Sequence, residues 1–245
     1  MSAPHASASV GRLRHELAGA FRLADRFGFS EGICNHFSAV SPIDDEQFLI
    51  NPLGLHWSEI GPDDLLLIDG DGNVVEGRGS VEATALHIHV AGHRANRRHR
   101  VILHVHMPHA TALTMVEGGR LEMAHQTAVR FHRRMTHVAF RGIALDRAEG
   151  DRLADAQRAD PSVDVMFLDH HGVTIGGESV AVAFDDLYYL ERACRQQILA
   201  QSTGLPLRLI PEPVLGETSC QLEQIRRESA AEHFEAQMRV HGRLP

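Results

Sequence analysis

The sequence has few cysteines and few aromatic residues, and it has no long apolar run. Its three cysteines, Cys34, Cys194 and Cys220, lie far apart and form no CxxC pair. This spacing indicates neither a disulfide framework nor a thiolate zinc site. No apolar run approaches the roughly 18 residues that span a bilayer, and residues 1–10 lack the apolar core of a signal peptide. We therefore expect a cytoplasmic protein that makes no membrane contact.

Positive charge is also scarce. The 24 basic residues, all of them arginines, are outnumbered by 32 acidic residues, which gives a formal net charge of −8. Arginines cluster in residues 94–100 and 130–134, but solvated helix faces explain such clusters better than a nucleic-acid surface does. Two tyrosines and one tryptophan offer little for base stacking. The expected partner is a small-molecule substrate rather than a nucleic acid or a membrane.

Histidine is abundant, with 18 residues in a chain of 245. It is the commonest transition-metal ligand, so the excess suggests a metal site. At this frequency about one His-x-His triplet arises by chance, so the triplet alone proves nothing.

The chain shows no domain boundary, so we expect one domain over residues 1–245, with a core at about 10–205 and a C-terminal helical tail at 206–245. Helices and strands interleave, and hairpin signals are frequent. This pattern favours a three-layer αβα domain around a mixed sheet. The predicted helices cover residues 10–29, 81–97, 108–115, 148–159, 180–202 and 219–238. The predicted strands cover residues 34–40, 47–50, 64–68, 73–75, 101–106, 135–140 and 163–168, with a turn or strand at 171–173.

Two histidines of one predicted strand could share a metal ion. His104 and His106 are two residues apart, so their side chains point to one face, roughly 6.5–7 Å apart along the backbone. Imidazoles so placed can reach one ion at about 2.0–2.1 Å, while Val105 points into the opposite layer. The segment Asp169-His170-His171-Gly172, after the strand at 163–168, supplies candidates for a third ligand. Three protein ligands leave a coordination position open for substrate.

Glu82 stands at the start of the predicted helix at 81–97. The helix dipole favours a carboxylate there, so electrostatic capping is its simplest role. The alternative is a metal ligand or a general base.

Six segments in order resemble the class II aldolase/adducin family, and the resemblance covers residues 10–205. The segments are residues 32–38 (GICNHFS), 51–54 (NPLG), 82–89 (EATALHIH), 104–106 (HVH), 171–173 (HGV) and 183–193 (AFDDLYYLERA). The resemblance implies an αβα fold around a largely antiparallel, nine-stranded sheet. It also implies a homotetramer with sites at subunit interfaces.

Carried over residue by residue, the resemblance makes His104, His106 and His171 the ligands of one divalent metal ion per subunit. Zinc is the expected ion, with manganese, iron or cobalt as alternatives. Ala85 stands at the position of the family's catalytic glutamate, and Glu82 lies one helical turn earlier, from where its carboxylate could reach the same spot.

Another departure concerns the proton donor. The family's aldolases use tyrosines of a neighbouring subunit, whereas Tyr188 and Tyr189 both fall in the long helix at 180–202. His125 lies near the corresponding position and is a candidate proton donor, although a structural role is the simpler interpretation.

Positions that would hold phosphate in the family's sugar-phosphate aldolases have lost most of their hydroxyl groups, with Val81, Leu53 and an imidazole in their places. We therefore expect an unphosphorylated substrate. The residues that the resemblance implies for substrate binding are His36, Ser38, Asn51, Gly54 and Ser80.

The resulting hypothesis is a metal-dependent lyase, an aldolase or decarboxylase, that cleaves a C–C bond next to a carbonyl of a small acid through a metal-stabilised enediolate. Glu82 would shuttle the proton. The first alternative is a non-catalytic adducin-like interaction module, although this chain lacks the long basic tail of such proteins. An epimerase or an oxygenase on the same scaffold is a further alternative.

Overall fold

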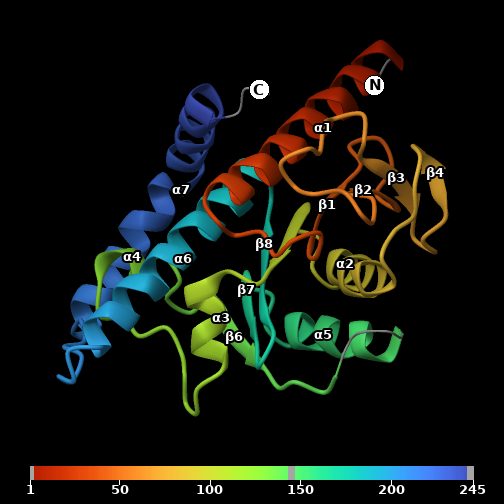
Figure 1. Cartoon of the computed structure of the whole chain (residues 1–245). Helices are drawn as coiled ribbons and strands as arrows, with labels where there is room; N and C mark the ends of the chain where they lie inside the picture. Colours follow the sequence, from red (N-terminus) through yellow and green to blue (C-terminus); the bar gives the residue numbers. More distant parts are fainter. Residues whose placement is uncertain (1–2, 143–146, 242–245) are drawn as a thin grey trace.

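The computed structural model describes residues 3–142 and 147–241. One sheet lies between two layers of helices (Figure 1), so the prediction of a three-layer α/β fold is confirmed. The strands are β1 (His36–Val40), β2 (Gln47–Ile50), β3 (Leu66–Asp69), β4 (Val74–Glu76), β5 (Val101–Val105), β6 (Met135–Val138), β7 (Val165–Leu168) and β8 (Gly172–Gly177). The helices are α1 (Ala3–Arg26), α2 (Ala83–Ala95), α3 (Pro108–Thr114), α4 (Gln126–Val129), α5 (Arg147–Ala159), α6 (Val180–Gln201) and α7 (Glu212–His241).

The sheet of the described residues has eight strands in the order β4-β3-β2-β1-β5-β8-β7-β6. The expected count of nine strands is therefore wrong. All neighbours pair antiparallel except β6 and β7, which are parallel. The segment before β1 adds only an isolated bridge between Glu31 and Cys34. Left-handed backbone conformations at Gly32 and Asn35 interrupt the extended chain there.

Alternation along the strands separates the two faces of the sheet. Phe37, Leu103 and Val105 point into the larger core, which α1, α3 and α6 cover. The residues that alternate with them along the strands, among them His36 and His104, therefore point to the face that α2 covers. The expected inward orientation of Val105 is confirmed, because its side chain is fully buried in the larger core.

Helices α2 and α5 pack side by side on this second face. Ile88 of α2 and Leu153 of α5 share a small core with Met166 of β7. The two helices approach closely at Gly150, where an added Cβ would lie 2.5 Å from the carbonyl oxygen of His87. Helix α2 is thereby fixed above β1 and β5, where it faces the candidate metal centre.

Element boundaries follow the sequence-based expectations closely, with four main differences. Helix α1 begins at Ala3, α7 is longer than expected, β8 extends to Gly177 rather than ending at 173, and the four-residue α4 was not predicted. Helix α7 packs on α6. Phe234 is buried between them, and Nδ1 of His233 lies 2.8 Å from the carboxylate of Asp185. Across the described ranges, no helix is long and apolar enough to cross a membrane.

Candidate metal centre

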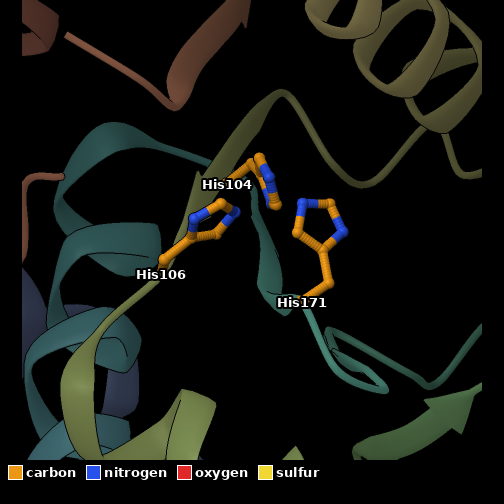
Figure 2. A group of neighbouring side chains, drawn as sticks. All are labelled: His104, His106 and His171. Atoms are coloured by element: carbon orange, nitrogen blue, oxygen red, sulfur yellow. The ribbon is translucent and has the colours of Figure 1, made fainter. Parts of the chain in front are cut away.

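The structure brings together the three histidines that the sequence predicts as metal ligands (Figure 2). One ring nitrogen from each of His104, His106 and His171 lies within 4.8 Å of the other two. The ring centroids are 4.7–5.1 Å apart. Nitrogens this close, from segments distant in sequence, form the kind of cluster that a single transition-metal ion needs.

Two antiparallel strands create this proximity. His104 belongs to β5 and His106 follows its end, while His171 directly precedes β8. Val105 is paired with Val173, so the end of β5 lies beside the beginning of β8. Gly172 permits the close approach, because an added Cβ would lie 2.5 Å from the Val105 carbonyl oxygen and 2.6 Å from Cδ2 of His106.

Hydrogen bonds at Nδ1 orient two of the rings. Nδ1 of His104 donates to the carbonyl oxygen of Val173 at 3.1 Å, and Nδ1 of His106 contacts the carboxylate of Glu31. Each contact leaves Nε2 as the nitrogen available to an ion, which is the usual arrangement of metal-binding histidines. Nε2 of His106 is buried and has no hydrogen-bond partner among the described residues. An ion would satisfy this atom, so the residues fit a metal.

Burial keeps His104 and His171 unprotonated, as metal ligation requires. Desolvation lowers the pKa of His104 well below its usual value, and the neighbouring imidazoles His36, His171 and His106 add to the shift. Desolvation, followed by the effect of His106, lowers the pKa of His171 to about 4, while Glu31 and Glu149 act in the opposite direction. The charges of these two carboxylates therefore reach His171.

The predicted catalytic carboxylate, Glu82, is not part of the cluster. It is the N-cap residue of α2, and its carboxylate accepts a hydrogen bond of 2.8 Å from the hydroxyl of Thr84. Ala85 is buried one turn later, in an apolar cluster with Phe48 and Leu66. Neither Glu31 nor Glu149 is among the site residues predicted from the sequence. Glu31 directly precedes the family segment at residues 32–38, and this position is the sequence signal that could have identified it.

His36 and Ser38, both predicted to bind substrate, lie under α2 in a buried chain of side chains. His36 is 3% exposed, and its ring centroid is 5.0 Å from that of His104. Nδ1 of His36 is 2.8 Å from Nε2 of His89, and the Ser38 hydroxyl lies 2.5 Å from Nδ1 of His89 and 2.6 Å from Nε2 of His93. His89 and His93 are four residues apart in α2 and therefore share a helix face, but this spacing alone does not predict these contacts.

The remaining predicted substrate-binding residues lie in two adjoining segments. The backbone N–H of Leu53 donates to the carbonyl oxygen of Ser80 at 2.8 Å, which joins the turn at 51–54 to the segment before α2. Gly54 has a φ of 94°, a conformation that favours glycine. The Asn51 side chain is buried and hydrogen-bonds the backbone of Asn35 and Phe37, so within this chain it supports the start of β1.

His125 caps a helix. Its Nδ1 accepts a hydrogen bond from the backbone N–H of Thr127 at the start of α4. It also lines a cavity of about 410 Å³ between α4 and α6, whose described lining residues do not include the metal-ligand candidates. Within one chain, His125 therefore has a structural role.

Comparisons with known sequences relate this chain to a known family. The family profile described as "Class II Aldolase and Adducin N-terminal domain" matches residues 15–198. A Pseudomonas aeruginosa protein named "Putative aldolase class 2 protein" is 31% identical over 210 residues, with 85% of this chain and 79% of that protein covered. The decarboxylase NovR of Streptomyces niveus is 29% identical, covering 86% and 77%. Mouse alpha-adducin is 31% identical, but only 27% of its length is covered, against 81% of this chain.

Solved structures agree on the fold. An aldolase II superfamily protein from Pseudomonas syringae superposes with a TM-score of 0.88 and 34% identity, covering 95% of this chain and 92% of that one. An L-fuculose 1-phosphate aldolase from Glaciozyma antarctica gives a TM-score of 0.84 over 97% and 92% of the two chains. At 24% identity, the second likeness concerns the fold alone.

Proposed function

Because this chain belongs to the class II aldolase and adducin N-terminal domain family, we propose that it is a metal-dependent lyase. It would cleave a C–C bond next to a carbonyl group of an unphosphorylated small acid, by retro-aldol cleavage or by decarboxylation. The observation that carries the proposal is the cluster of three histidines, with the buried, unpartnered Nε2 of His106.

In this proposal His104, His106 and His171 hold one divalent ion, with zinc as the expected metal. Nitrogen ligands alone also accommodate manganese, iron or cobalt. Such an ion supplies a Lewis acid that draws electron density from oxygens of the substrate. The Val173 carbonyl and Glu31 orient the ligand rings, and this kind of orientation raises metal affinity.

The loop chemistry supports an unphosphorylated substrate. Leu53 and Val81 carry no hydroxyl group to bind phosphate oxygens. Asn51 and Ser38, which could offer polar atoms, are engaged with the protein interior. The likeness to a decarboxylase agrees with a carboxylated substrate. A small hydroxy or oxo acid is therefore the proposed substrate class.

The proton-transferring group is proposed to be a carboxylate. Glu82 is the candidate from sequence, and we propose Glu149 as the stronger candidate, because its negative charge raises the pKa of His171. The carboxylate of Glu149 pairs with Arg152, whose Nε lies 2.8 Å from it. We expect Glu149→Gln to lower turnover of the zinc-loaded protein by at least about 100-fold and Glu82→Gln to have a smaller effect. The opposite order would assign the proton to Glu82.

The test of function begins with metal analysis of the purified protein. The zinc-loaded protein is then screened against 2-oxo and hydroxy aromatic acids for released carbon dioxide or aldehyde. Release that disappears in His104→Ala supports the lyase. A protein that holds no divalent metal, or one that is loaded and inert across the panel, contradicts it.

A non-catalytic interaction module is the second candidate, favoured by the likeness to alpha-adducin. It requires no metal centre, so the assembled histidine cluster weighs against it. The homotetramer that the family resemblance implies remains a proposal. Light scattering of the purified protein tests it, and a monomer would contradict a site shared between subunits.

A further inference from the structure

A chain of four hydrogen bonds leads from the metal centre into the layer between α2 and the sheet. It runs from His36 to His89, through the Ser38 hydroxyl to His93, and ends at the backbone carbonyl of His99, 2.7 Å from Nδ1 of His93. All four linked side chains are at most 3% exposed. Because such groups have no water to bond, the position of each proton is determined by its neighbours.

The carbonyl of His99 determines the direction of the chain. A carbonyl oxygen can only accept, so Nδ1 of His93 carries a proton. Desolvation lowers the pKa of His93 to about 3, so at neutral pH this ring is uncharged and its Nε2 is an acceptor. The Ser38 hydroxyl has one proton, which it must donate to Nε2 of His93. Its oxygen can then only accept from Nδ1 of His89.

The same logic extends to the metal centre. With its proton on Nδ1, neutral His89 offers a bare Nε2, so Nδ1 of His36 donates to it. Neutral His36 then has no proton on Nε2. This atom forms no hydrogen bond with any described residue. The two nitrogens of an imidazole point in divergent directions, so Nε2 of His36 faces away from His89.

His36 is a direct neighbour of the ligand cluster. It is paired with His104 across β1 and β5, so both side chains lie on the same face of the sheet. Its ring is 5.0 Å from His104, against 4.8 Å for the ligand pair His104 and His171. His36 is nevertheless outside the group of three whose nitrogens all lie close together.

We propose that Nε2 of His36 is a fixed hydrogen-bond acceptor beside the metal centre, and that it selects a substrate with a hydroxyl group at this point. The inference rests on the proposed function and names its substrate class more narrowly, as hydroxylated acids. An ether, a carboxylate or a phosphate at the same place has no proton to donate. A site built to bond a substrate hydroxyl discriminates strongly against analogues that lack it.

The first experiment measures binding of glycolate and methoxyacetate to the zinc-loaded full chain by calorimetry. Glycolate has a hydroxyl proton and methoxyacetate does not. The ratio of the two binding affinities is compared between the parent protein and His36→Phe, so that the difference between the two acids in their own affinity for zinc cancels. We expect the preference for glycolate to fall about 3- to 10-fold in His36→Phe, which corresponds to one hydrogen bond. An unchanged preference in a variant that retains zinc overturns the proposal.

The second experiment is independent of substrate and serves if His36→Phe does not fold. Nitrogen NMR of the zinc-loaded protein with ¹⁵N-labelled histidine reports which ring nitrogen carries each proton. We expect Nδ1 to carry the proton in His36, His89 and His93. A proton on Nε2 of His36 overturns the proposal, whether or not the protein is a lyase.

Removing the Ser38 hydroxyl, which links His89 to His93 in the series of hydrogen bonds, makes this test more specific. In Ser38→Ala, His93 should keep its proton on Nδ1 because of the His99 carbonyl, whereas His36 and His89 should show both tautomers. Ser41→Ala is the matched control, because Ser41 is equally buried at the end of β1 but outside the chain. A single, unchanged tautomer of His36 in Ser38→Ala would show that the chain does not set it.

Discussion

Nδ1 of His104 lies 3.1 Å from the carbonyl oxygen of Val173, across the two strands that carry the histidine cluster. Because the carbonyl can only accept, this contact places the proton of His104 on Nδ1 and leaves Nε2 free for an ion. The backbone pairing of β5 and β8 therefore fixes both the position of this ligand and its tautomer.

The cluster predicts a strong loss of metal when a ligand is removed. We expect His104→Ala and His171→Ala each to lower zinc affinity more than about 100-fold, beyond the effect usual for residues that only support a ligand. Competition with a chromophoric chelator measures it. His170→Asn is the control, because His170 adjoins a ligand, and asparagine tolerates its φ of 56°. Full metal content in either ligand variant would contradict the site.

Glu31 predicts a smaller loss of affinity. Its carboxylate contacts Nδ1 of His106, so Glu31→Ala should weaken zinc binding about 10- to 100-fold. Glu31→Gln keeps a carbonyl oxygen that can accept the same hydrogen bond, and it should lose less. The exposed Glu228 supplies the control variant, Glu228→Ala, which should bind zinc as the parent does. Equal affinities for Glu31→Ala and the parent would remove the orienting role.

Acid should destabilise the metal-free protein. Desolvation lowers the pKa of His93 to about 3 in the folded state, while the unfolded chain takes up this proton near pH 6.5. Below pH 6.5 the unfolded state therefore binds more protons, and each such ring lowers the free energy of unfolding by about 1.4 kcal/mol per pH unit.

Urea denaturation at pH 7, 6 and 5 measures this loss. His93→Gln should reduce the slope of the unfolding free energy against pH by about 1.4 kcal/mol per pH unit, which corresponds to the uptake of one proton. A parent slope of zero between pH 6.5 and 5 would contradict the prediction, as would equal slopes in the two proteins.

Buried and exposed ion pairs of similar chemistry should differ in strength. Asp164 is 5% exposed and pairs with Arg98, Arg134 and His99. Asp164→Asn should cost about 3 kcal/mol of unfolding free energy, because the buried Arg134 then loses one carboxylate partner, although it retains Asp186. Asp45→Asn removes the partner of Arg100 at the surface and should change stability little. Denaturant unfolding of both variants checks this, and similar effects of the two changes would contradict it.

Local patterns account for the parts of the fold that the sequence predicted. His104 and His106 follow from strand alternation, and His171 from its position after a buried strand. The contacts of His89 depend on the rotation of α2 above the sheet, which its periodicity does not determine. Glu31 lies in a turn whose direction is set by left-handed residues rather than by an apolar pattern. Four-residue α4 is too short to produce a periodic signal.

The contact between the end of β5 and the beginning of β8 joins points that lie far apart along the chain. His106 and His171 are 65 positions apart, and the intervening segment contains α3, α4, β6, α5 and β7. An ion bound by both would act as a cross-link that closes this loop and reduces the entropy of the unfolded chain. The backbone amides of the segment between His106 and His171 should then exchange hydrogen more slowly in the zinc-loaded protein than in the metal-free protein.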